Sequence, residues 1–345
     1  MFSSKKSYTK IIVLILFITL LSNCKIVFYG VEQGIGQIKL VNKAVPIKKI
    51  MKDSLYADSI KTRLAFVEEV KQYAIDSLGL KKSKNYSTFY DQHGKQIVWI
   101  VYAAPKYKME AYNWKYPILG KMPYKGFFNQ KKAEREANKM KEQGFDVRIG
   151  NVSAWSTLGY FKDPILSNVL DRSDGELAEL IIHELTHATV YVKGEAQFNE
   201  NLASFIGING AKKFLIHKYG KNSEKYNEYI GKLNDQELIT NHFLKATKKL
   251  DSLYNTFEGK TDIKKDSLKT NMIEQIIIDM KNIPFYNTEI PERYWEKREL
   301  INNAFFAIYI TYFMDLSQFE DQYKNEFNSN IKKYMKYIAK KYKSV

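Results

Sequence analysis

The spacing of apolar residues predicts helices at the start of the chain. Residues 25–80 have helical spacing that is broken at Pro46, and a long amphipathic stretch near 56–78 has its apolar residues on one side. The first quarter of the chain is therefore expected to be helical.

The middle of the chain, residues 85–160, has a different pattern. Its segments 95–105 and 145–158 are rich in Val, Ile and aromatic residues, which favour strands. Residues 130–143 lie between them and have helical spacing with many charged side chains. This order predicts two strands with a helix that crosses over between them.

From residue 173 to the end, almost every segment again has helical spacing. Breaks between helices are expected near 193–195, 220, 258–263 and 282–291. The predicted fold class is α+β, a mostly helical domain with a small β-sheet before the first helix of this region. With no repeats and no low-complexity linker, residues 24–345 are expected to form one domain.

The N-terminus has the pattern of an export signal. Three lysines precede the 11-residue apolar run Ile11–Leu21, which has the length of a signal-peptide core and is short for a membrane span. Cys24 follows directly and resembles the lipid-bearing cysteine of bacterial lipoproteins, although Asn23 departs from the small residue usual at that position. We expect residues 1–23 to be a signal peptide and Cys24 to carry lipid; the alternative is an uncleaved N-terminal anchor.

The charge and cysteine content of the chain limit the partners and the kinds of active site that it can have. The 345 residues carry a net charge of +16, and without residues 1–23 the remaining 51 basic and 38 acidic side chains leave +13. The lysines are scattered and form no nucleic-acid-binding module. The simpler interpretation of the positive charge is that these lysines lie on solvated faces of helices. Cys24 is the sole cysteine of the chain, which excludes a cysteine nucleophile or a thiolate metal site in its body.

Residues 173–190, SDGELAELIIHELTHATV, are the strongest helix candidate. The initial serine and Glu176 match a capping box, which places the helix start. His183 and His187 are four residues apart, so on a helix they project from one side and could share a Zn²⁺ ion. Glu184 completes an H-E-x-x-H pattern, in which the glutamate acts as the base for the metal-activated water.

A catalytic zinc site needs a third protein ligand, and two glutamates follow the second histidine. Glu200 would lie about one turn into a returning antiparallel helix, on a face with Ala203, Ser204 and Gly207, whose small side chains permit close approach. Glu195 lies in the expected turn beside a glycine, from which its carboxylate would have to fold back. Glu200 is therefore the predicted ligand and Glu195 a solvated turn residue.

The H-E-x-x-H pattern followed by Asn-Glu resembles the gluzincin metallopeptidases, and a wider set of segments resembles a family of bacterial lipoproteins described as putative aminopeptidases. The matching segments are residues 29–47, 155–164, 183–194, 198–207 and 302–312. The resemblance implies one Zn²⁺ per chain, metal ligands at His183, His187 and Glu200, and a general base at Glu184. It also implies a peptide substrate, from which an amino-terminal residue is removed.

The donor that would stabilise the reaction's oxyanion stays open at this stage. His217 is a weak candidate because a continuous helix would turn it about 100° from the face of Glu200. Tyr160, Tyr309 and Tyr312 lie in the resembling segments, but each is more often a packing residue. Residues 152–158 could be an edge strand that pairs with the substrate backbone, or an ordinary strand end.

Two other functions remain open from the sequence. The protein could be a zincin that binds peptide or cell-wall material without cutting it, or a basic envelope-binding lipoprotein whose histidines are incidental. The expected setting in every case is the bacterial cell envelope, with the chain tethered outside the cytoplasm through Cys24 and with no nucleic-acid partner.

Overall fold

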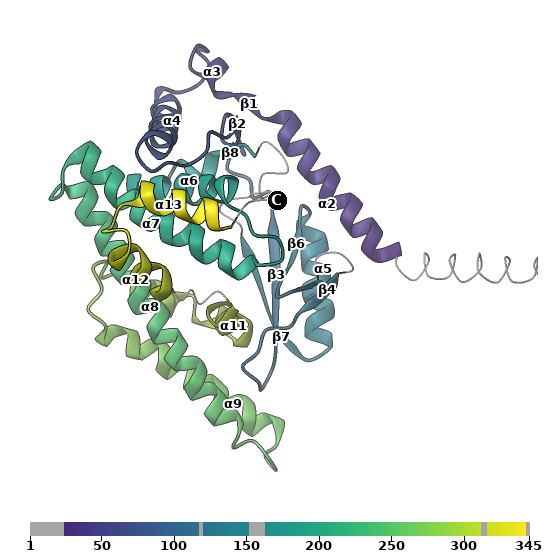
Figure 1. Cartoon of the computed structure of the whole chain (residues 1–345). Coiled ribbons are helices and arrows are strands. Elements are labelled where there is room, and N and C mark those ends of the chain that lie inside the picture. Colours follow the sequence, from purple (N-terminus) through teal and green to yellow (C-terminus); the bar gives the residue numbers. More distant parts are fainter. Residues whose placement is uncertain (1–23, 117–119, 152–162, 312–315, 343–345) are drawn as a thin grey trace, which may run out of the picture.

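A computed structural model of the chain describes residues 24–116, 120–151, 163–311 and 316–342. Its helices surround three small sheets, as expected for a mostly helical α+β protein (Figure 1). The predicted fold class is confirmed. The strands of the described residues form three separate small sheets, where the sequence predicted one.

The longer helices are α2 (Cys24–Lys43), α4 (Asp58–Asp76), α5 (Gln130–Glu142), α6 (Asp174–Thr189), α7 (Ala196–Tyr219), α8 (Glu224–Tyr254), α9 (Asp262–Asp279), α11 (Asn303–Thr311), α12 (Ser317–Asn325) and α13 (Ile331–Lys341). The shorter helical segments are α3 (Ile47–Ile50), η1 (Ser167–Val169), η2 (Met280–Asn282), α10 (Ile290–Glu296) and η3 (Arg298–Leu300). The strands are β1 (Val45–Pro46), β2 (Thr88–Tyr90), β3 (Trp99–Pro105), β4 (Trp114–Tyr116), β5 (Gly120–Met122), β6 (Lys125–Phe127), β7 (Phe145–Asn151) and β8 (Ile165–Leu166).

The central sheet has the order β6-β3-β7, and β3 is antiparallel to both neighbours. The register pairs Val101 of β3 with Ile149 of β7 and with Lys125 of β6. Helix α5 joins the two outer strands and buries Ala133, Ala137 and Met140 against the sheet. The predicted crossover helix is therefore confirmed, but it follows β6, a three-residue strand too short to produce an alternating pattern.

Helices α6 and α7 pack side by side and form the centre of the largest core, with α4 and α13 against them (Figure 1). The buried apolar face of α6 consists of Leu177, Ala178, Ile181, Ile182 and Leu185, all without exposed surface. A second core, around Phe243 of α8 and Phe306 of α11, lies among α8, α9, α10 and α11. The α6–α7 pair is thus held in place by packing that does not involve its polar residues.

A charged contact fixes the start of α6. Arg63 of α4 donates from Nη1 to Asp174 Oδ1 at 2.5 Å and from Nε to the Leu170 carbonyl at 2.9 Å. Tyr219, the last residue of α7, donates to the other Asp174 oxygen at 2.8 Å. Burial would raise the pKa of Asp174, but the hydrogen bonds from Arg63 and Tyr219 outweigh it and lower the pKa. One carboxylate therefore joins α4, α6 and α7.

Replacing Arg63 with Met is expected to destabilise the fold by about 1.5–3 kcal/mol, because charge-assisted hydrogen bonds are lost while the apolar stem remains. The Asp174 contribution is present above its unfolded pKa of about 3.9 and is lost as pH falls through its lower folded pKa. Urea unfolding between pH 7 and pH 3 measures both effects. Lys61→Met on the same helix is the control, since Lys61 lies 3.8 Å from a fully exposed Asp58 and should contribute little.

Among the helices of the described residues, none is both long enough and apolar enough to cross a membrane.

Candidate metal centre

Local sequence places the two histidines on α6. Ser173 and Glu176 form the expected capping box, in which the Glu176 carboxylate accepts from the Ser173 backbone amide at 3.1 Å. The helix ends at Thr189, as the apolar pattern predicted to within one residue. His183 and His187 project from the edge of the buried face, and the side chain of His187 is only 2% exposed.

Helix α7 approaches α6 closely because its facing residues are small. A Cβ atom on Gly207 would lie 3.1 Å from the Glu179 carbonyl oxygen and 3.2 Å from the Cβ of His183. Ala203 is fully buried and Ser204 nearly so. The expected small-residue face is present, and it brings the backbone of α7 within reach of the histidines.

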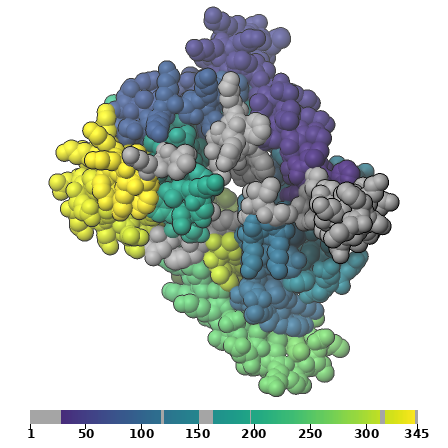
Figure 2. Space-filling model, turned by 45° about the vertical axis from the view of Figure 1, so that its right-hand side comes forward, coloured from purple at the N-terminus to yellow at the C-terminus, as the bar shows by residue number. Residues whose placement is uncertain are grey.

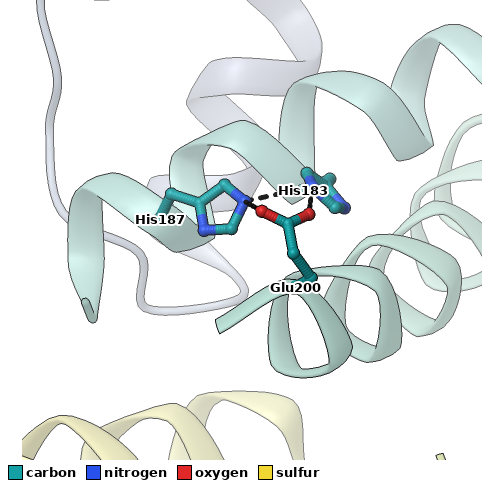
Figure 3. A group of neighbouring side chains, drawn as sticks. All are labelled: His183, His187 and Glu200. Atoms are coloured by element: carbon teal, nitrogen blue, oxygen red, sulfur yellow. Dashed lines mark hydrogen bonds and ion pairs between the residues drawn. The ribbon is translucent and has the colours of Figure 1, made fainter. Parts of the chain in front are cut away.

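His183, His187 and Glu200 converge from the two helices (Figure 3). The two Nε2 atoms are 3.1 Å apart, and Glu200 reaches His183 Nε2 at 3.6 Å and His187 Nε2 at 3.5 Å, one carboxylate oxygen to each. All three donor atoms lie within 4.8 Å of one another, so these residues could hold a metal ion. We call His183, His187 and Glu200 the metal group. Figure 2 shows the teal surface of this helix pair between the yellow C-terminal helices and the blue sheet region.

The local electrostatics favour the ligating forms of two of these groups. Burial, together with the positive charge of a protonated His183, lowers the pKa of His187 to about 4. Burial would raise the pKa of Glu200, but hydrogen bonding and attraction to the histidines lower it. For His183, burial is outweighed by Glu200 and the nearby acidic charges, which raise its pKa. A neutral His187 and an ionised Glu200 are the forms that donate electron pairs to a cation.

The Nδ1 atoms of the two histidines also indicate that Nε2 is the nitrogen available to a metal ion. His183 Nδ1 lies 3.4 Å from the Ser204 hydroxyl, which leaves Nε2 as the nitrogen turned toward Glu200. His187 Nδ1 is buried, and the described residues supply no hydrogen-bond partner for it. Both rings therefore present Nε2 to the point where the three side chains meet.

Asn199, next to Glu200, holds the turn between the helices. Its side chain is buried, accepts from the Val192 amide at 2.8 Å and donates to the Val192 carbonyl at 2.8 Å. These two bonds close the turn from α6 to α7 and set where α7 begins. In the sequence, Asn199 stands out only through its position directly before the predicted ligand Glu200.

Asn199→Ala is expected to weaken metal binding about 10–100-fold, the range found when a residue that orients a ligand is removed. It should also destabilise the fold by about 1–3 kcal/mol, since both polar groups of Val192 lose their partner. Competition with a chelating dye and urea unfolding measure the two effects. Asn199→Asp keeps the acceptor and should fall between Ala and the parent chain.

A pocket of about 320 Å³ adjoins the metal group on the side of His183 and Glu184. Glu176 and Glu179 of α6 and Tyr229 and Lys232 of α8 also line it. Glu184 itself is nearly buried, and its charge contributes to the raised pKa of His183. The predicted base and a substrate-sized space therefore lie together beside the histidines. A pocket of about 490 Å³ between α4 and η1 shares no residue with this group.

The remaining sequence candidates lie elsewhere. Glu195 is exposed at the cap of α7 and is not part of the metal group, as expected. His217 is exposed near the end of α7, and its ring lies tilted beside that of Tyr73, with the ring centroids 5.1 Å apart. Tyr309 packs in the second core, with its hydroxyl 3.3 Å from that of Tyr294. Tyr160, Tyr312 and the proposed edge strand 152–158 lie outside the described residues.

Tyr124, in the turn between β5 and β6, was not singled out from the sequence. Its pKa is raised by burial and by the negative charge of Glu200. This interaction places a phenol from the sheet side within electrostatic reach of the metal group. No pattern in the sequence could reveal this, because the contact joins two segments about 75 residues apart.

A mostly helical α+β fold, in which two packed helices bring together a histidine–histidine–glutamate group that could hold a metal ion beside a pocket, defines the class of protein. The chain belongs to the family described as "Putative aminopeptidase", whose model matches residues 28–343. No curated protein and no solved structure matches the chain.

Proposed function

We propose that the protein is a zinc-dependent aminopeptidase that hydrolyses the first peptide bond of its substrates. The observation that carries this proposal is the convergence of His183, His187 and Glu200, with Glu184 on the same helix and beside the same pocket. Membership of an aminopeptidase family supports the reaction class.

The donor set suits zinc. Two imidazoles and one carboxylate are a common catalytic set for Zn²⁺, with ligand distances of about 2.0–2.1 Å. Ligands at those distances and tetrahedral angles are about 3.3 Å apart. The separations of 3.1, 3.5 and 3.6 Å between the three side chains are close to this value. Three protein ligands also leave a fourth position for a water molecule or a substrate.

The chain's own residues supply the proton transfers. A bound Zn²⁺ ion would lower the pKa of a coordinated water and polarise the scissile carbonyl. In our proposal, the Glu184 carboxylate accepts the proton from that water and then delivers it to the leaving amine. Its nearly buried position beside His183 strengthens its interaction with a positive site, because the local dielectric is low.

The adjoining pocket supports cleavage at a free amino terminus. Glu179 lines this pocket one turn before His183. The Tyr229 hydroxyl donates a hydrogen bond to the Glu179 carboxylate at 2.8 Å. Burial raises the pKa of Glu179. A substrate ammonium that approaches Glu179 would oppose this shift, because a nearby positive charge favours the ionised carboxylate. A carboxylate that lines the same pocket as His183 fits the recognition of an α-amino group, which separates aminopeptidases from endopeptidases.

A peptide library tests the reaction. The zinc-loaded protein is incubated with free peptides and with the same peptides acetylated at the amino terminus, and products are identified by mass spectrometry. Release of single amino-terminal residues from free peptides alone supports the proposal. Internal cleavage of both libraries would replace aminopeptidase by endopeptidase. One equivalent of zinc with no cleavage of either library would favour the alternative function, a zincin-like binding protein without activity.

We further propose that residues 24–345 form one zincin-like domain, tethered through lipid on Cys24 to a membrane of the bacterial cell envelope. The apolar run before Cys24 supports export, and the absence of any other cysteine leaves this thiol as the acceptor.

Cys24→Ser is expected to leave export intact and to move the protein from the membrane fraction into the soluble fraction. Fractionation and immunoblotting of cells that express each form measure this shift. Retention of the Ser variant in the membrane fraction at the full precursor mass would indicate an uncleaved anchor.

A further inference from the structure

Helix α2 has one face that is committed to the protein body. Tyr29 donates from its hydroxyl to the Gly126 carbonyl at 2.7 Å, and Gln37 donates to Asp163 Oδ1 at 3.3 Å. A Cβ atom on Gly36 would lie 2.4 Å from the ring of Phe128, so the helix is pressed against the segment that follows β6. The orientation of α2 about its own axis is therefore set by the fold.

The opposite face of α2 is apolar and exposed. Phe28, Val31, Ile35 and Ile38 are 72%, 54%, 48% and 50% exposed. At 100° per residue these four positions fall within an arc of about 80°, and at 1.5 Å per residue they extend over about 15 Å. We call these four residues the α2 outer stripe. Large side chains lined up in this way are costly to leave in water.

Charge along the helix complements an anionic surface. Lys39 and Lys43 are exposed on one flank of the α2 outer stripe, and Lys48 and Lys49 follow in α3. Glu32 is the one acidic residue in the sequence of α2, and it is paired with Lys132 of α5 at 2.5 Å. A cationic flank beside an apolar stripe is the pattern of helices that lie in the headgroup region of a bilayer.

The position of α2 in the chain identifies the partner. Its first residue is Cys24, which lies three positions after the end of the apolar run Ile11–Leu21. The lipid that we propose on Cys24, or an apolar run retained as an anchor, would each place a membrane at the N-terminal end of this helix. Figure 1 shows α2 along the outer edge of the molecule, and Figure 2 shows its purple surface at the exterior.

We propose that the α2 outer stripe lies in the interfacial layer of an anionic phospholipid bilayer, parallel to the membrane plane. The body of the protein is then held against the membrane along α2 instead of hanging from a flexible tether. Because the other face of α2 is fixed to the protein body, this contact sets one orientation of the whole protein relative to the membrane. The proposal does not depend on the metal site or on peptidase activity.

Site-specific fluorescence in the full chain tests the proposal. Cys24→Ser removes the sole native thiol, and single cysteines are then introduced at Val31, at Ile35 and, as the control, at Ile263, which is 85% exposed at the start of α9. Each variant is labelled with an environment-sensitive nitrobenzoxadiazole dye and added to vesicles of phosphatidylcholine and phosphatidylglycerol, with and without nitroxide-labelled lipid. Residues 1–23 are present in every variant, so they recruit all of them equally.

The expected result is blue-shifted emission at positions 31 and 35 with at least a twofold loss of intensity in nitroxide-labelled vesicles, and neither change at position 263. Emission at 31 and 35 that matches position 263 would overturn the proposal, since the stripe would then face water. A blue shift at 31 and 35 without quenching by labelled lipid would also overturn it, because protein would then cover the stripe. Circular dichroism of each labelled variant confirms that the fold is retained.

Discussion

Glu184→Gln is expected to lower peptide hydrolysis by at least ~10²-fold while zinc remains near one equivalent per chain, because removal of a general base costs about 10²–10⁴-fold. Glutamine keeps the size and hydrogen-bonding reach of glutamate but cannot accept the proton. The metal ligands His183, His187 and Glu200 are untouched, so the metal content should not change. Turnover of the peptides identified by the library screen and metal analysis of the same preparation measure both quantities.

Glu176→Gln is a matched control on the same helix. Glu176 lines the pocket, but its carboxylate is taken up by the helix cap and by Lys232 at 2.9 Å. This variant should lose a little stability and keep most of its turnover. Unchanged turnover in Glu184→Gln would exclude Glu184 as the base and leave the metal group in place, whereas joint loss of zinc and turnover would assign it a structural part in the site.

Glu200→Ala is expected to weaken zinc binding more than the about 10–100-fold seen when an orienting residue is removed, because a direct ligand is lost. It should also abolish the zinc-dependent part of the thermal stability, since a metal that binds only the folded state stabilises it. Glu195→Ala should change neither, because Glu195 is exposed at the start of α7 and lies outside the metal group. Zinc stoichiometry and melting temperature with and without a chelator decide between the two glutamates.

One outcome of this pair would contradict the assignment of Glu200 as the ligand. Full occupancy in Glu200→Ala combined with loss in Glu195→Ala would reverse the assignment. Glu200→Asp provides a finer check, because it keeps the charge but shortens the side chain by about one methylene, and the carboxylate now reaches both Nε2 atoms at 3.5–3.6 Å. Intermediate affinity in this variant is expected.

The sequence alone determined the local geometry of α6, the helix that carries His183 and His187. A capping box marks where α6 begins, and helical periodicity then places His183 and His187 on one side of it. Both features depend on residues within about four positions of one another, so they can be read without knowing the fold. The α+β class and most breaks in the helical region are of the same kind, because they follow from local apolar spacing.

The convergence of Glu200 with the histidines was predicted from a tight turn and a stripe of small residues, but only the tertiary structure shows how it is achieved. Gly207 lets α7 approach the carbonyl of Glu179, and Asn199 closes the turn through both backbone groups of Val192. Packing at this distance depends on the shapes of two helices together, which periodicity along one of them does not specify.

Contacts between distant segments could not be predicted from the sequence, because spacing along one segment does not specify which other segment it meets. The short strands β1, β2, β6 and β8 have two or three residues each, too few for an alternating pattern, and they exist because partners far along the chain satisfy their backbone groups. The interaction of Tyr124 with Glu200 and the joining of α4, α6 and α7 through Asp174 likewise arise from folding. Local spacing thus determined which side chains could form the metal group, and tertiary packing decided which of them meet.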